Sequence, residues 1–219
     1  MTNGNAQQTL NKQNEPWLIA VLVANAVVFY LVIKSDSLLI TGFGALFKEW
    51  EAALATAGLG AIIVRLLTGQ LDEIARSRLV FWRWSHPLPG CRAFTQYGLN
   101  DDRYTMDAVR QINGQALPTE PQQQNARWYA FYAQVWNQAI VQEAHRNYLF
   151  YRDYATMSIL LIIAFGGSGF WFIPSRATAA LYMLVLVAQY LLARQAARNY
   201  GIRLVRDVLA KTVMRMRMI

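Results

Sequence analysis

Long blocks of apolar residues alternate with polar segments along the chain, and this pattern predicts a membrane protein. The first block runs from Trp17 to Ile33 and contains no charged residue. The second runs from Ala52 to Leu67. The third has two arms, Tyr154 to Ile173 and Ala177 to about Leu192, joined by a short turn at Pro174. Because an α-helix rises 1.5 Å per residue, about 17 to 20 apolar residues cross a hydrocarbon core of roughly 30 Å.

These segments predict an all-α membrane protein with four transmembrane helices and a small, mainly helical cytoplasmic domain inserted between spans 2 and 3. The expected parts are a disordered tail (1–15), spans 1 and 2 (16–67), the cytoplasmic domain (68–153), a transmembrane hairpin (154–193) and a basic amphipathic tail (194–219). Pro16 suits the first turn of span 1. The alternative for this block is a cleaved signal peptide, which the long polar segment before it disfavours.

Several residues within the spans suggest how the helices pack. Alanines at 53, 57 and 61 form one stripe of span 2, where small side chains let helices approach closely. Arg65 is interpreted as reaching the headgroups, with a buried functional arginine as the alternative. Glycines at 166, 167 and 169 indicate close packing, with a kink or a flexible point as alternatives. Arg152 and Asp153 stand where a helix meets the lipid, so we expect them to anchor it.

The polar segment between spans 2 and 3 predicts a water-facing domain that ends in a long helix. Helical periodicity extends from Glu120 to Asp153, Pro121 suits its first turn, and no breaker separates it from Tyr154. We therefore expect one helix that continues into the bilayer. Its aromatic stripe from Trp128 to Leu149 is interpreted as core or as a surface for a partner helix.

The distribution of basic residues predicts the orientation of the chain. There are 21 Lys and Arg against 13 Asp and Glu, a net charge of +8, and the tail from Arg194 holds seven of the basic residues. Cytoplasmic flanks are rich in cations, so we expect the N-terminus, the middle domain and the C-terminus inside, at the bacterial inner membrane. The tail also alternates apolar and basic residues, which predicts an amphipathic helix on anionic lipid. Nucleic-acid binding is the less favoured alternative.

Sequence patterns that indicate chemistry are sparse. The single cysteine, Cys91, and the two separated histidines, His86 and His145, do not form a metal-binding pattern. Phosphate-binding loops and nucleophile elbows are missing from the sequence. Asp101 and Asp102 are interpreted as a helix cap or a solvated loop rather than a paired-carboxylate site. We therefore expect no catalytic residue, no metal and no cofactor.

The most distinctive stretch runs from Arg78 to Phe94. It is aromatic and basic at first and then contains two prolines and a glycine, which predicts a rigid elbow between the membrane surface and the cytoplasmic domain. A ligand site for an anion is the alternative interpretation. Its cationic candidates are Arg83, His86, Arg92 and Arg127.

Motifs in the middle of the chain resemble a group of small bacterial inner-membrane proteins. They are Leu79-Val-Phe-Trp-Arg, His86-Pro-Leu-Pro-Gly-Cys-Arg-Ala-Phe, Asp102-Arg103, Gln124-Asn125, Trp128-Tyr129 and Tyr151-Arg152-Asp153, within a similarity that covers about 52–173. Some small multi-span bacterial proteins of this size resemble effectors of anti-phage defence, in which a cytosolic domain senses a signal and the spans damage the membrane. The resemblance implies this role and assigns no functional residue.

The expected function is a non-enzymatic membrane effector or sensor, whose cytosolic domain receives a signal and whose helices oligomerise or perturb the membrane. Expected partners are the bilayer, with anionic lipids at the C-terminal tail, and either further copies of the chain or a cytosolic protein. The alternative is a membrane adaptor that recruits a cytosolic partner through the aromatic stripe. A transporter or channel is less favoured, because the apolar blocks contain few ionisable residues.

Overall fold

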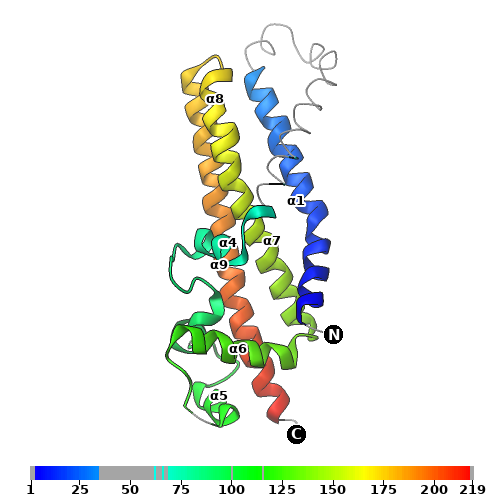
Figure 1. Ribbon diagram of the computed structural model, residues 1–219, viewed down its shortest axis with the longest axis vertical. Coiled ribbons are helices and arrows are strands. Elements are labelled where there is room, and N and C mark those ends of the chain that lie inside the picture. The colour runs from blue at the N-terminus through cyan, green and yellow to red at the C-terminus, as the bar shows by residue number, and fades with distance from the viewer. Residues whose placement is uncertain are drawn as a thin grey trace. The chain divides into compact units, whose positions relative to one another are not determined.

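The computed structural model describes residues 3–34, 69–99, 101–114 and 116–217, together with Ile62 and Leu66, and its elements there are all helical (Figure 1). They are α1 (Asn3–Ile33), α4 (Glu73–Phe81), η1 (Pro89–Arg92), η2 (Ala93–Tyr97), α5 (Met106–Asn113), α6 (Pro121–Val135), α7 (Ala139–Leu161), η3 (Ile162–Gly166), α8 (Gly167–Phe172) and α9 (Arg176–Arg217). The prediction of an all-α protein is therefore confirmed for the described residues.

Three stretches are long and apolar enough to cross a membrane: Leu10–Ile33, Ala139–Phe172 and Arg176–Met216. They contain the predicted spans 1, 3 and 4. Apart from Ile62 and Leu66, the predicted span 2, with its alanine stripe and Arg65, lies outside the described residues.

The chain divides into two compact units, each assembled from separated segments. Unit 1 comprises Met1–Lys12, Glu73–Arg152 and Arg194–Ile219, and unit 2 comprises Gln13–Asp72 and Asp153–Ala193. Both α7 and α9 contribute residues to the two units.

The first helix begins earlier than the sequence predicts. Helix α1 starts at Asn3, so Pro16 lies inside it and not in its first turn, and the segment expected to be a disordered tail is helical from that residue onward. Adding a residue to an existing helix gains a hydrogen bond without the cost of nucleation. Leu10 and Asn14 are also buried. A proline interrupts this helix locally because it removes one backbone donor.

The predicted hairpin of two apolar helical segments forms in unit 2 where the sequence places it. Helix α7 passes through the π-helical turn η3 into α8, and Ile173 adopts an extended conformation before Pro174, as the residue before a proline favours. A Cβ added to Gly166 would lie 2.7 Å from the sulfur of Met183, whereas one added to Gly167 would meet nothing within 4 Å. Close packing is therefore confirmed at Gly166 and not at Gly167.

Aromatic rings join the apolar segments of unit 2. The ring of Phe29 stacks on Phe165 with centroids 4.7 Å apart, and it lies 5.6 Å from the ring of Tyr182. Within this unit, α1 runs parallel to the apolar end of α7, and α9 runs antiparallel to both (Figure 1).

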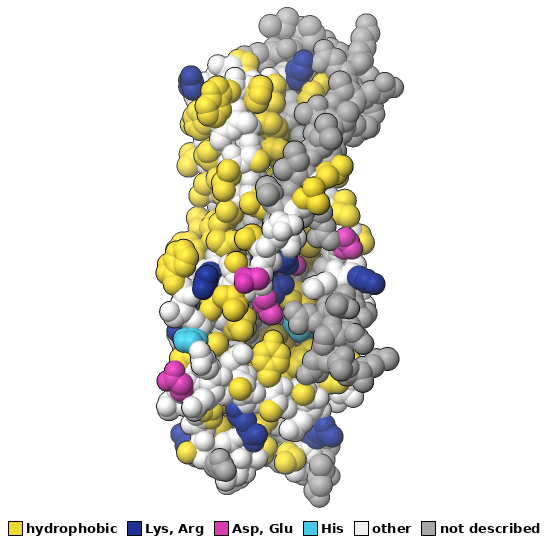
Figure 2. Space-filling model, in the orientation of Figure 1, with side chains coloured by type: hydrophobic (Ala, Val, Ile, Leu, Met, Phe, Trp, Pro, Cys, Tyr) yellow, Lys and Arg dark blue, Asp and Glu magenta, His cyan; other side chains and the backbone are white. Residues whose placement is uncertain are grey.

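Large hydrophobic side chains lie on the outside of unit 2. The surface drawn in Figure 2 shows such side chains along α8 and α9. The most exposed in these helices are Trp171, Phe172, Leu181, Leu184 and Leu192. Exposed aliphatic surface on this scale is typical of a protein whose solvent is lipid.

In unit 1, the predicted long helix is broken, which corrects the expectation of one continuous helix from Glu120 to Asp153. Helix α6 ends at Val135 and α7 begins at Ala139. The Tyr132 hydroxyl lies 2.9 Å from Nδ1 of His145, although 13 residues of straight helix would separate them by about 20 Å. The break folds α6 back on α7 and buries the aromatic stripe. The expectations that Pro121 opens this region and that a helix continues from Asp153 into the apolar segment at Tyr154 are confirmed.

The C-terminal segment of α9 packs inside the protein, whereas the sequence predicts that it lies on the membrane surface. Its apolar face is buried inside unit 1, including Leu204, Val205, Val208 and Leu209. A Cβ added to Gly201 would lie 3.0 Å from Phe81 and 3.2 Å from Tyr148. The apolar face that the sequence assigns to the membrane surface is therefore buried in unit 1, where α4 and α7 approach the helix at Gly201. Contact between the basic residues of the tail and anionic lipid stays a prediction.

Candidate functional site

A surface groove of about 460 Å³ lies in unit 1, between the segment that follows α4 and the start of α6. Its lining includes Arg78, Trp84, His86, Cys91 and Asn125. Arg78 is in the last turn of α4, and Asn125 is in the second turn of α6. The stretch from Arg78 to Phe94 therefore forms one wall of the groove, as the alternative interpretation of that stretch requires.

Arg78 is the cation at the mouth of the groove. Its Nε donates a hydrogen bond to the Trp84 carbonyl at 3.0 Å, and its guanidinium lies 5.9 Å from the Trp84 ring centroid. Trp84 itself is 83% exposed. The arginine therefore holds the loop in place and keeps an accessible positive charge beside an exposed aromatic ring.

Of the four predicted site residues, His86 is the one that lines the groove. It adopts a positive φ of 50°, which is uncommon for a residue other than glycine. Arg92 supports this conformation, since its Nη1 donates to the His86 carbonyl at 3.0 Å. Arg83 lies elsewhere and donates to Oε1 of Gln96 at 3.4 Å.

Arg127 joins two helices of unit 1. It donates a hydrogen bond to the side-chain oxygen of Asn113, at the end of α5, and its guanidinium lies 4.8 Å from the Phe131 ring centroid. Asn113 is followed by Gly114, whose φ of 68° ends the helix. The four predicted residues therefore do not converge on one site. Arg78 was missed, although it opens the most distinctive stretch of the sequence.

A buried glutamine fixes the wall of the groove against α6. Oε1 of Gln124 accepts hydrogen bonds from the backbone N–H groups of Phe94 and Thr95 at 3.0 and 3.3 Å, and its amide donates to the Thr119 carbonyl at 2.7 Å. Beside it, η1 approaches α6 so closely that a Cβ on Gly90 would lie 2.9 Å from the Trp128 ring. Only glycine fits at this position, because any side chain would collide with Trp128. The groove wall is thus held firmly against α6.

The groove has the chemistry of an anion-binding surface. Its described lining offers the Arg78 guanidinium, the His86 imidazole, the Ser85 hydroxyl and the Trp84 indole. Among the described lining residues there is no carboxylate. Cys91 is buried, and desolvation raises the pKa of its thiol, so it is not an activated nucleophile. The metal-ligating residues in the described part of the chain form no cluster of three.

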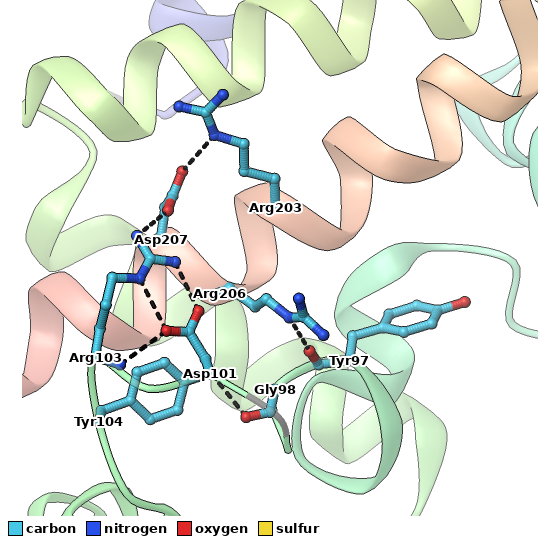
Figure 3. A network of polar contacts seen from close by, with 8 residues as sticks. All are labelled: Tyr97, Gly98, Asp101, Arg103, Tyr104, Arg203, Arg206 and Asp207. Carbon is cyan, nitrogen blue, oxygen red and sulfur yellow. Dashed lines mark hydrogen bonds and ion pairs between the residues drawn. The ribbon is translucent and has the colours of Figure 1, made fainter.

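A second polar cluster, which we call the clamp, ties the end of α9 to the loop after η2 (Figure 3). Arg103 lies between two carboxylates, at 2.7 Å from Asp101 and within hydrogen-bond distance of Asp207. Arg203 approaches the other oxygen of Asp207 at 3.4 Å, and Arg206 donates to the Tyr97 carbonyl at 2.9 Å.

Both carboxylates of the clamp form ion pairs with arginines of the clamp. Hydrogen bonds from Arg103 lower the pKa of Asp101 below its ordinary value. Asp101 also accepts from the backbone N–H of Arg103 at 3.0 Å, which forms a local turn, whereas the N-cap of α5 is Thr105. Burial raises the pKa of Tyr104, whose hydroxyl donates to the Gly98 carbonyl at 2.8 Å. Both carboxylates are thus paired with arginines, and the clamp is a structural feature.

Arg152 is more deeply buried than an interface anchor would be. Its side chain is 2% exposed, its Nη1 lies 3.5 Å from Oε1 of Glu73, and its guanidinium is 5.8 Å from the Tyr148 ring centroid. The Tyr148 hydroxyl is in turn 3.3 Å from the Ser77 hydroxyl. These contacts connect α7 to the first residue and the middle of α4 within unit 1.

Comparison of the chain with known protein families, with curated proteins and with solved structures finds no match.

Proposed function

We propose that the protein is a multi-pass membrane sensor or effector, in which unit 1 receives a signal and unit 2 responds within the bilayer. The observation that carries this proposal is the continuity of α7 and α9. Residues 139–152 and 194–217 of these helices belong to unit 1, while residues 153–161 and 176–193 belong to unit 2. A change in packing at one end of a continuous helix is transmitted rigidly to the other, provided that the element has two arrangements of similar energy.

The proposed topology has four spans, with both termini and unit 1 in the cytoplasm of a bacterial cell. Helix α1 runs parallel to α7, so Lys34 and the N-terminal end of α7 belong to opposite membrane faces. Glu73 is paired with Arg152, immediately before the apolar part of α7. In this topology the chain crosses the bilayer between Lys34 and Glu73, and the predicted span at 52–67 supplies that crossing. The basic residues of unit 1 support its cytoplasmic location.

The signal in this proposal is an anion that occupies the groove. The adaptor alternative assigned partner binding to the stripe between Trp128 and Leu149, but Trp128, Phe131 and Tyr132 are buried in unit 1. A partner would need a different surface, so the sensor is the function that we favour.

Membrane potential in induced bacteria tests the proposal. Ala196→Pro interrupts α9 at the point where it enters unit 1, because proline removes a backbone donor and clashes with the preceding turn. Ala177→Pro is the matched control, since it falls in the first turn of the same helix, where proline is tolerated. We expect the wild type and the control to depolarise the membrane on activation, and Ala196→Pro to leave the potential unchanged. Unchanged potential in the wild type under every activating condition, phage infection included, would contradict the effector role.

A role in anti-phage defence is the further part of this proposal, and it rests on the resemblance described above. We expect cells that carry the wild-type protein to lower the plating efficiency of at least one phage relative to cells that carry Ala196→Pro. Equal plating efficiency of a broad phage panel on both strains would contradict a role in anti-phage defence.

A further inference from the structure

We infer that the Trp82–Trp84 corner of unit 1 is a binding site for the phosphate headgroup of an anionic phospholipid. This corner comprises Trp82 and Trp84 together with Arg78 and Arg194. The inference rests on the proposed function only in taking α9 to span the bilayer, and it requires no signalling activity.

The position of Arg194 along α9 sets the depth of the corner. Arg176 and Arg194 flank 17 residues without a charge, and 18 helical steps between them correspond to about 27 Å, which matches a hydrocarbon core. Arg194 is therefore at headgroup depth. Its guanidinium lies 3.6 Å from the centre of the Trp82 ring, and this contact brings Trp82 to the same depth.

The exposure of the two tryptophans distinguishes the corner from the rest of unit 1. Trp82 is 60% exposed and Trp84 is 83% exposed, while Trp128 of the same unit is buried. The positive φ of 51° at Trp82 is rare for a bulky residue. Exposed indole rings are unfavourable in water but are enriched at the headgroup level of membranes, where an apolar ring and a polar N–H are both accommodated.

The charges of the corner indicate which headgroup it takes. Arg194 and Arg78 each lie beside an exposed indole, and the groove next to Arg78 adds the His86 ring and the Ser85 hydroxyl. Guanidinium groups beside exposed indole rings favour a headgroup with a net negative charge over a zwitterionic headgroup, whose ammonium they would repel.

Thermal unfolding of the full-length protein in detergent tests this inference. The midpoint is followed by circular dichroism at 222 nm after addition of dioleoylphosphatidylglycerol, dioleoylphosphatidylcholine or inorganic phosphate. We expect phosphatidylglycerol to raise the midpoint by about 4 °C more than phosphatidylcholine. The Arg78→Gln/Arg194→Gln double variant should lose most of this difference relative to its own baseline. Arg110→Gln, which removes an exposed arginine of α5, should retain it.

Three results would overturn the inference: equal stabilisation by the two lipids, an undiminished difference in the double variant, or the same shift with inorganic phosphate alone, which would indicate a soluble phosphorylated ligand. If the double variant does not fold, quenching by brominated phosphatidylglycerol replaces it. The lipid should then quench wild-type tryptophan emission more strongly than that of Trp82→Phe/Trp84→Phe, and equal quenching would overturn the inference. A loss of membrane depolarisation with intact lipid selectivity would refute the proposed function and leave this site standing.

Discussion

Outside the Trp82–Trp84 corner, most large hydrophobic side chains of unit 1 are buried, whereas many of those in unit 2 are exposed. In unit 1, Phe131 is 1% exposed and Leu204 is 2% exposed, and arginines meet carboxylates in the clamp. In unit 2, Leu184 is 64% exposed and Trp171 is 83% exposed. Burial of apolar surface drives folding in water, whereas lipid makes that burial unnecessary and leaves packing to small residues such as Gly166. The comparison indicates that one chain is folded for two solvents.

The largest expected effect comes from replacing one phenylalanine in each unit with alanine, which tests the difference in packing. Phe131→Ala should lower the free energy of unfolding by about 4 kcal/mol, because it leaves a cavity in a packed core. Phe172→Ala is the matched control in unit 2, where the ring is exposed, and should cost less than about 1 kcal/mol. Denaturant titration of the detergent-solubilised protein measures both values. Similar losses would mean that the two units do not differ in packing.

A charge placed on an exposed leucine of each unit sharpens the comparison. Leu184 lies near the middle of the apolar part of α9, so Leu184→Arg should disfavour membrane insertion by about 3 kcal/mol. Leu99→Arg, at an exposed position of unit 1, should change insertion negligibly. The fraction of protein that resists carbonate extraction from membranes reports the difference. Normal insertion of the Leu184 variant would argue against lipid contact at this face.

The sequence predicts the parts of the fold that depend on local pattern. The hairpin turn at Pro174 and the start of α6 at Pro121 follow from residues within a few positions of each feature. The break after Val135 does not, because it is set by the contact between Tyr132 and His145 across the fold. The burial of Leu204 also depends on contacts with residues far away in the sequence, so the local pattern does not predict it.

The candidate site shows the same limit. A cationic residue does line the groove, but the position of each arginine side chain is fixed by a hydrogen-bond partner that helical periodicity does not predict. Arg83 meets Gln96, and Arg127 meets Asn113, which is 14 positions away. Arg78 lies in the groove because α4 ends beside Trp84. Which arginines face a ligand is thus decided by tertiary contacts, and a single sequence does not contain them.

Loss of the clamp should have a smaller effect than loss of the core. Arg103→Ala leaves Asp207, which is 1% exposed, with Arg203 as its remaining clamp partner, and should cost about 2 kcal/mol of unfolding free energy. This value allows for the solvent exposure of Arg103. Arg110→Ala removes an exposed pair with Asp107 and should cost less than about 0.5 kcal/mol. Equal costs in thermal unfolding would show that the clamp does not stabilise unit 1.

Acid should weaken the clamp by the smallest amount. The pKa of Asp101 is lower in the folded protein than its ordinary value of 3.8, because Arg103 donates hydrogen bonds to the carboxylate. Its contribution to stability is therefore complete above that value and is lost as the pH falls through the lower, folded-state pKa. The unfolding midpoint of Asp101→Asn should depend less on pH between about 5 and 3 than that of the wild type. Asp107→Asn, in an exposed pair, is the control, and a change of equal size there would contradict this assignment.

Solvent accessibility of labelled cysteines tests the two-solvent account most directly. With buried Cys91 replaced by alanine, Leu184→Cys and Leu99→Cys each carry a nitroxide spin label in the full-length protein, reconstituted in lipid nanodiscs. The label at position 184 should collide with dissolved oxygen and be shielded from an aqueous nickel complex, and the label at position 99 should show the reverse. Free access of the nickel complex to position 184 would contradict the claim that lipid is the solvent of unit 2.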